Sequence, residues 1–183
     1  MNYYESVRDL FEKKYWASPP RDLYTANGYS HSTVPRQKAY FISSLITHPG
    51  QIMDMGCGNG LLLKLLMSTS PHKLIPYGVD MLKQSIRQAK NIVLPAYRKN
   101  FTVGNVLDHA FRVKFDWILI FPDSVADEDF RAYFEKCYNA LTPQGALIIY
   151  VDQDTLARVK RGIQLAVGQH LARLLGVLLE ARA

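Results

Sequence analysis

The sequence predicts an α/β protein built on a doubly wound, mostly parallel sheet, and three observations carry this prediction. From Gln51 onward, short apolar segments alternate with segments of helical periodicity. Two of the apolar segments, Phe115–Phe121 and Ala146–Val151, are almost free of polar residues, which is typical of strands covered on both faces. A glycine-rich turn, Gly56–Gly60, stands where the first strand gives way to a helix.

The elements follow one another along the chain. A helix is expected over Pro35–His48, because proline suits the first turn of a helix. Strands are expected at Gln51–Met55, Lys73–Asp80, Phe101–Asn105, Phe115–Phe121 and Ala146–Val151. Helices are expected between them at Leu61–Ser68, Met81–Asn91 and Asp127–Leu141, the last one ended by Thr-Pro-Gln-Gly. Strands that alternate with helices predict helices on both faces of one sheet.

The two ends of the chain differ from this core. Residues 1–34 are rich in tyrosine and in turn-forming residues, and we expect them to form a helical lid over the domain of residues 35–183. The tail after Val151 is short, and its apolar residues recur at three- and four-residue steps, which predicts a helix over Thr155–Leu175. Only Gly176–Ala183 resembles a late strand. The C-terminal part of the sheet is therefore expected to be abbreviated.

An abbreviated sheet leaves the strand Ala146–Val151 with an edge that must be covered. Two covers remain open, the tail helix of the same chain or a second copy of the chain. For the second case we expect a homodimer that uses one leucine-rich surface. Its residues are Leu171, Leu174, Leu175 and Leu178.

Composition narrows the class of protein. The chain has 183 residues, 48% of them apolar, and a net charge of +6, which suits one globular domain. The basic charge includes no run of more than two adjacent Lys or Arg residues, so a nucleic-acid partner is not favoured. Two distant cysteines, Cys57 and Cys137, form neither a disulfide framework nor a CxxC site. No signal peptide or membrane span is evident, and we expect a cytoplasmic location.

The glycine turn indicates what the protein binds. The spacing GxGxG, with leucine at position 61, departs from the dinucleotide fingerprint. Asp54 lies two residues before the first glycine, where a carboxylate would repel a pyrophosphate and attract an ammonium group. Asp80 ends the next strand, where an acid accepts hydrogen bonds from ribose hydroxyls. An adenosine with a cationic, amine-bearing tail fits these features, and S-adenosylmethionine is such a molecule.

The motifs resemble those of class I S-adenosylmethionine-dependent methyltransferases, with the small-molecule type favoured. "IMDMGCGNG" resembles the first motif of the family, "YGVDM" the second, and "FTVGNV" the third, with Asn105 at the place of the usual acid. The resemblance covers Pro35–Val151. It implies S-adenosylmethionine as cofactor and these cofactor-binding residues: Asp54, Gly56, Cys57, Gly58, Asn59, Gly60, Asp80, Met81, Asn105, Val106, Phe121, Tyr15 and Tyr24.

Several of these residues also have a plain structural interpretation. Asp54 and Asp80 are each suited to capping a helix, although we favour a role for Asp54 in ordering the loop and meeting the amino acid tail. Asn105 is equally suited to a turn. The segment Phe121–Ser124 departs from the Asn/Asp-Pro-Pro-aromatic motif of enzymes that methylate the amino groups of bases and glutamine.

The expected function is transfer of a methyl group to a small-molecule acceptor by in-line displacement, mainly by positioning. His31 and Asp123 are candidate catalytic residues, His31 as a general base and Asp123 as a group that orients the acceptor. The aromatic residues expected to wall the pocket are Tyr15, Trp16, Tyr24 and Tyr29. Two alternatives remain open: a methyltransferase that acts on RNA or protein, and a noncatalytic partner subunit that binds S-adenosylmethionine.

Overall fold

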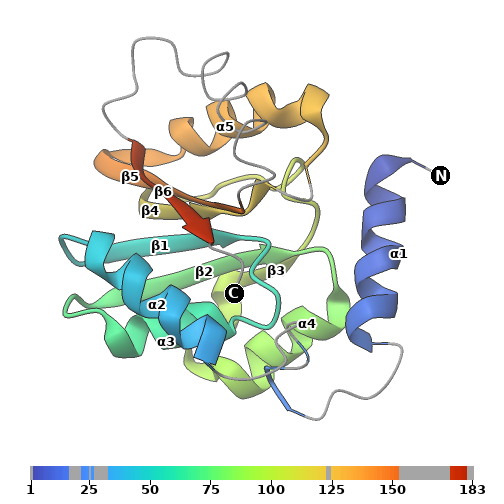
Figure 1. The fold of residues 1–183 in the computed structure, drawn as a ribbon, viewed down its shortest axis with the longest axis horizontal. Coiled ribbons are helices and arrows are strands. Elements are labelled where there is room, and N and C mark those ends of the chain that lie inside the picture. Colours follow the sequence, from blue (N-terminus) through green and yellow to red (C-terminus); the bar gives the residue numbers. More distant parts are fainter. Residues whose placement is uncertain are drawn as a thin grey trace.

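A computed structural model describes residues 2–16, 22–24, 26, 33–122, 125–152 and 174–180. Within these residues a six-stranded sheet has the order β3-β2-β1-β4-β5-β6, and every neighbouring pair is parallel (Figure 1). The strands are β1 Gly50–Met55, β2 Leu74–Asp80, β3 Phe101–Val103, β4 Phe115–Ile120, β5 Leu141–Asp152 and β6 Leu174–Glu180. The predicted parallel sheet is thus confirmed.

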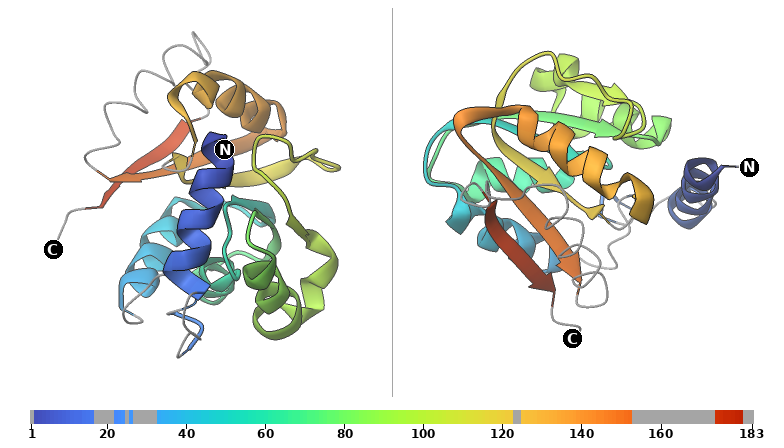
Figure 2. Two further views of the ribbon diagram at one scale, coloured as in Figure 1. Left: turned by 90° about the vertical axis from the view of Figure 1, so that its right-hand side faces the viewer. Right: turned by 90° about the horizontal axis from the view of Figure 1, so that it is seen from above.

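Helices cover both faces of this sheet (Figures 1 and 2). The α-helices are α1 Tyr3–Trp16, α2 Thr33–Leu45, α3 Leu61–Thr69, α4 Lys83–Gln88 and α5 Phe130–Asn139. Three shorter helical elements lie in two of the connections: the π-helical η2 Ala89–Val93 and the 3₁₀ helix η3 Pro95–Asn100 between β2 and β3, and the 3₁₀ helix η5 Asp127–Asp129 before α5. α5 packs on one face, whereas α2, α3 and α4 pack on the other.

Strand β4 shows why its sequence is almost wholly apolar. Ile118 and Ile120 belong to the core beneath α5, whereas Trp117 and Leu119 belong to the core beneath α2 and α3. Because successive side chains of a strand point to opposite faces, a strand covered on both faces has no exposed position for polar residues. The indole N–H of Trp117 donates a hydrogen bond to the carbonyl of His48, at 3.2 Å.

Helix α1 stands apart from these layers, beside the carboxyl ends of the strands (Figure 2). None of its residues is buried. Its first turn is attached by Tyr4, whose hydroxyl donates to Asp129 at 2.5 Å and accepts from the N–H of Ala126 at 3.3 Å. Burial and the neighbouring Asp129 carboxylate raise the pKa of the Tyr4 hydroxyl. The predicted N-terminal helix is present, and it bridges to the connection that precedes α5.

Two expectations about the last strands were wrong. β5 begins at Leu141, five positions before the expected start, because the Thr-Pro-Gln-Gly segment forms a bulge: Phe115 pairs with Leu141 and Trp117 already pairs with Ala146. A Cβ at Gly145 would lie 2.6 Å from the carbonyl oxygen of Phe115, so only glycine fits there. The Thr-Pro-Gln-Gly segment, which was expected only to end the preceding helix, is therefore part of the strand.

The C-terminal segment is the second correction. Leu174, Leu175 and Leu178 lie in strand β6, which pairs in parallel with β5, and not on a helix. A short run of Leu and Val has no clear period, so helix and strand are hard to distinguish from sequence there. β6 covers the edge of β5, and the homodimer remains a prediction. Leu171 and most of the expected tail helix lie outside the described residues.

Candidate functional site

A cavity of about 370 Å³ opens at the carboxyl ends of β1 and β2, beneath α1. It lies at the point where the strand order turns back, with β2 on one side of β1 and β4 on the other, which is where open α/β sheets bind ligands. Its lining residues are Phe11, Lys14, Tyr15, Lys38, Asp54, Met55, Gly56, Cys57, Gly58, Leu62, Asp80, Met81, Leu82, Ser85, Val106 and Phe121.

The glycine turn brings backbone to the cavity wall. Gly56, Gly58 and Gly60 have φ values of 96°, 53° and 76°, in the region that side chains with a Cβ disfavour. The N–H groups of Gly56 and Cys57 donate to the carbonyl of Val79 at 2.9 and 3.0 Å, which fixes the turn to β2. A Cβ added at Gly56 would meet nothing within 4 Å, so this backbone faces open space. The turn therefore exposes main chain where a ligand approaches.

Asp80 holds the two loops around the cavity together. Its Oδ2 accepts the N–H of Gly58 at 2.9 Å, and its Oδ1 accepts the N–H of Leu82 at 2.8 Å. Burial raises the pKa of the Asp80 carboxyl, while these two hydrogen bonds lower it. Asp80 thus links the glycine turn to the start of α4, while the role in ordering the loop that the sequence suggested for Asp54 remains a prediction.

Asp54 is buried, and one of its carboxylate oxygens is unpaired within the described part of the chain. The residue is 1% exposed, and its Oδ1 has no hydrogen-bond partner among the described residues. Burial, and then the charge of nearby Asp80, raise the pKa of the Asp54 carboxyl to about 8. The hydroxyl of Ser85 in the same cavity is also buried and unpaired within the described part of the chain. Such buried acceptors are costly unless a ligand supplies donors.

Helix α1 closes the cavity with aromatic side chains. The rings of Phe11 and Tyr15 stack with centroids 5.6 Å apart and planes 16° from parallel. Burial and the charge of Asp80 raise the pKa of the Tyr15 phenol, which places this ring near the Asp80 carboxylate. The aromatic lid residue predicted at position 15 therefore lines the same cavity as the predicted ribose acid.

Two lysines border the cavity as well. Lys14 projects from α1 and Lys38 from α2. The Lys38 ammonium lies 4.1 Å from the ring centroid of Tyr150, and Tyr150 in turn packs on Phe121 with centroids 5.2 Å apart. Cations and buried carboxylates thus occur in one site, which suits a zwitterionic ligand such as an amino acid.

Most of the predicted cofactor residues meet in this cavity. Those that line it are Tyr15, Asp54, Gly56, Cys57, Gly58, Asp80, Met81, Val106 and Phe121. Asn105 lines a neighbouring cavity of about 520 Å³, and Tyr24 lines neither of the two. Gly60 lies behind the wall, against Phe101.

Asn59 also lies behind the wall, fully buried. Its amide donates to the carbonyl of Leu23 at 2.8 Å and to Gln88 at 3.0 Å, and its oxygen accepts the N–H of Leu61 at 3.2 Å. Its side chain thus ties the turn to the lid segment and to α4. The cofactor contact suggested for Asn59 remains a prediction.

Other residues differ from the predicted set. The candidate catalytic residues His31 and Asp123, and the pocket residue Tyr29, lie outside the described residues. Sequence reasoning missed seven residues that line the cavity: Phe11, Lys14, Lys38, Met55, Leu62, Leu82 and Ser85. A signal existed for Phe11, because Tyr4, Phe11 and Tyr15 recur at the spacing of one helix face.

No helix among the described residues is long and apolar enough to span a membrane.

Comparison with known proteins adds an independent finding. A family model described as a methyltransferase domain matches residues 52–145, just over half of the chain. No curated protein matches the chain in sequence.

Solved structures share the fold. An S-adenosylmethionine-dependent methyltransferase from Leishmania major has a TM-score of 0.62 at 19% identity, covering 91% of this chain and 76% of its own. An S-adenosylmethionine-bound amino pentose methyltransferase from Micromonospora echinaspora has a TM-score of 0.55 at 21% identity, covering 70% and 55%. YjhP from E. coli has a TM-score of 0.51 at 18% identity and covers 65% of this chain, which spans about half (49%) of the E. coli chain.

The family match covers the glycine turn, Asp80, strands β2 to β4 in full and most of β1. These are the elements that build the cavity, and the methyl donor of this family is S-adenosylmethionine. The chain belongs to the class I S-adenosylmethionine-dependent methyltransferases.

Proposed function

We propose that this protein binds S-adenosylmethionine in the cavity between β1, β2 and α1 and transfers its methyl group to a small molecule. The observation that carries the proposal is the pair of carboxylates, buried Asp54 and partly buried Asp80, beside a glycine turn that exposes backbone. One carboxylate is engaged by backbone N–H groups, and the other has an unpaired oxygen. This arrangement suits a nucleoside whose tail carries an ammonium group.

Each part of the cofactor has a partner of matching chemistry. Asp80 has oxygen lone pairs beyond those used by Gly58 and Leu82, and these accept the ribose hydroxyls. The unpaired Oδ1 of Asp54 accepts the ammonium group of the methionine tail, and Lys38 attracts its carboxylate. Gly56 lets the tail approach the main chain closely.

The bound cofactor supplies an electrophilic methyl group that is already activated by its sulfonium. The residues of the chain position the reactants and exclude water from them. Phe11, Tyr15 and Phe121 line the cavity with apolar surface, and their ring faces favour a neighbouring cation. A general base is needed only for an acceptor that must lose a proton, and His31 is the candidate from sequence.

A small acceptor is favoured over RNA or protein because α1 lies across the cavity. The stacked rings of Phe11 and Tyr15 wall it from above, and Tyr4 fixes the helix to the connection before α5. A macromolecular substrate would need α1 to move away. The similar structure from Micromonospora echinaspora is an amino pentose methyltransferase, which supports a small acceptor by analogy alone.

Radiolabelled S-adenosylmethionine tests the proposal with three acceptor pools: small metabolites, total RNA and unfolded protein. We expect label transfer to the metabolite pool, and we expect Asp80→Ala to weaken binding of S-adenosylhomocysteine by about 1–3 kcal/mol. Transfer to RNA or protein would replace the acceptor class. Tight binding with no transfer to any pool would favour a noncatalytic partner subunit, and no binding at all would end the proposal.

A further inference from the structure

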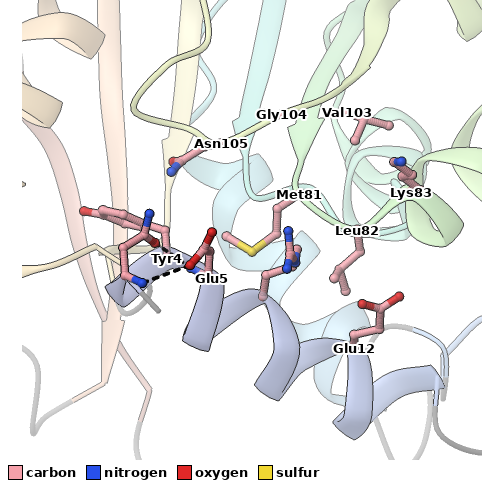
Figure 3. Close-up of a pocket in the computed structure, with 11 residues that line it drawn as sticks. Tyr4, Glu5, Glu12, Met81, Leu82, Lys83, Val103, Gly104 and Asn105 are labelled. Carbon is pink, nitrogen blue, oxygen red and sulfur yellow. Dashed lines mark hydrogen bonds between the residues drawn. The ribbon is translucent and has the colours of Figure 1, made fainter.

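A second cavity, of about 520 Å³, adjoins the first at Met81 and Leu82 (Figure 3). It lies between α1 and the carboxyl ends of β2 and β3. Its wall on the sheet side is mostly apolar, formed by Met81, Leu82, Lys83, Val103, Gly104 and Asn105. Its wall on the α1 side is mostly polar and charged, formed by Asn2, Tyr4, Glu5, Arg8 and Glu12.

This cavity lies where the base of a nucleoside would extend. With the ribose at Asp80, a base would have room in this adjoining cavity, which shares Met81 and Leu82 with the first and is also lined by Gly104 and Asn105. Apolar side chains suit the flat faces of a purine, whereas its edge carries donors and acceptors that need polar partners. The polar partners stand on α1.

Asn105 already accepts hydrogen bonds from the main chain of its own turn. Its Oδ1 accepts the N–H of Leu107 at 3.0 Å, and its main-chain carbonyl accepts the N–H groups of Asp108 and His109. The amide oxygen that the sequence suggested for the adenine amino group is thus engaged within the loop. A carboxylate on the facing wall of the cavity is a better match for the amino group, because it is charged and keeps more free lone pairs than the amide oxygen.

Glu5 is held in place to be that acceptor. The N–H of Asn2 donates to Oε2 of Glu5 at 3.0 Å, and the N–H of Glu5 donates to Oδ1 of Asn2 at 2.9 Å. This reciprocal pair is a capping box, which orders the side chain while leaving lone pairs on its carboxylate. Figure 3 shows Glu5 beside Tyr4 and Met81, whereas Glu12 lies beneath Leu82 and Lys83.

We propose that Glu5 accepts a hydrogen bond from the amino group of the adenine ring, so that the N-terminal helix selects the purine of the cofactor. This inference rests on the proposed function. A base with an oxygen in place of the amino group would present an acceptor to a carboxylate, and the two would repel each other. Selectivity for adenine therefore belongs to α1 and not to the sheet.

Two ligands and four proteins test the proposal by calorimetry. The ligands are S-adenosylhomocysteine and S-inosylhomocysteine, which has oxygen in place of the adenine amino group. The proteins are the wild type and the variants Glu5→Gln, Glu12→Gln and Glu135→Gln. Glutamine also serves in a capping box, so Glu5→Gln keeps the start of the helix. Glu135, exposed and paired with Arg131, controls for loss of one surface charge.

The wild type should bind the adenine ligand more tightly. Glu5→Gln should lower its affinity about tenfold, with the inosine ligand unchanged or tighter because the glutamine amide donates to its oxygen. Glu12→Gln and Glu135→Gln should keep the wild-type ratio. Equal losses for both ligands in Glu5→Gln, or a changed ratio in Glu12→Gln alone, would overturn the role of Glu5. Failure of the wild type to bind either ligand would refute the proposed function instead.

Discussion

The affinity for S-adenosylhomocysteine should rise with pH between 6 and 8, because Asp54 must lose its proton to receive the ammonium group of the ligand. Burial and Asp80 raise the pKa of the Asp54 carboxyl to about 8. With that pKa, about one molecule in a hundred carries an ionised Asp54 at pH 6, and about one in ten at pH 7. Affinity should therefore increase up to about tenfold per pH unit, which is about 1.4 kcal/mol, and level off above pH 8.

Calorimetry at pH 6, 7 and 8, each in two buffers of different ionisation enthalpy, measures both the affinity and the number of protons released on binding. Binding should release up to one proton near pH 6, and this release should fall toward zero above pH 8. Asp54→Asn is the matched control, because it keeps the shape of the side chain and removes its titration. Its affinity should be lower than that of the wild type at pH 8 and nearly independent of pH.

Two results would refute the reasoning. The first is a wild-type affinity that changes less than about twofold between pH 6 and pH 8. The second is a pH profile that Asp54→Asn retains, which would assign the titration to another group. Asp80, whose pKa is also raised by burial, would then be the next candidate.

Three further predictions concern stability and the lid. Without ligand, Asp54→Asn should raise the Tm more at pH 8 than at pH 5, because a carboxyl whose pKa is higher in the folded protein than its unfolded value of 3.8 destabilises the fold as the pH rises from about 4 to 8. Equal Tm shifts at both pH values would contradict this. Tyr4→Phe removes the hydrogen bond to Asp129 and should speed hydrogen exchange in residues 3–16, whereas binding of S-adenosylhomocysteine to the wild type should slow this exchange. Unchanged exchange in both comparisons would mean that α1 is a fixed part of the fold. Gly56→Ala should lower the free energy of unfolding by about 1–2 kcal/mol, because the backbone at this position has a φ of 96°, which strains a residue with a Cβ even where the Cβ has room. An unchanged midpoint of urea unfolding would argue against this strain.

The sheet was predictable because the sequence pattern of each strand is local to a few neighbouring residues. Each of β1 to β4 is a short apolar run bounded by turn residues, and the placement of Gly56 and Asp80 at strand ends follows from the order of elements. The expected boundaries differ from the observed ones by one or two residues for most of these strands. Family motifs then added the cofactor, which composition alone does not specify.

The failures involve contacts between distant parts of the chain. The bulge in β5 depends on pairing with Phe115, which no local pattern of Thr142–Gly145 reveals. The sequence suggested a cofactor contact for Asn59, and it did not reveal that the buried amide of this residue joins Leu23 to Gln88. β6 is extended because β5 offers it an edge, since its own leucines suit either period. Tertiary structure decides each of these cases.

The two carboxylates show how binding and stability oppose each other in this site. Asp80 is stabilised in the free protein by the N–H groups of Gly58 and Leu82, which order the loops before a ligand arrives. Asp54 lacks such donors in the described residues, and its proximity to Asp80 disfavours its charge further. Replacing Asp54 by a neutral residue would relieve that cost, yet it would also remove the charge that attracts an ammonium group. The instability at Asp54 is therefore the physical basis of its selectivity, because a ligand that brings a cation recovers the stability that the free protein lacks.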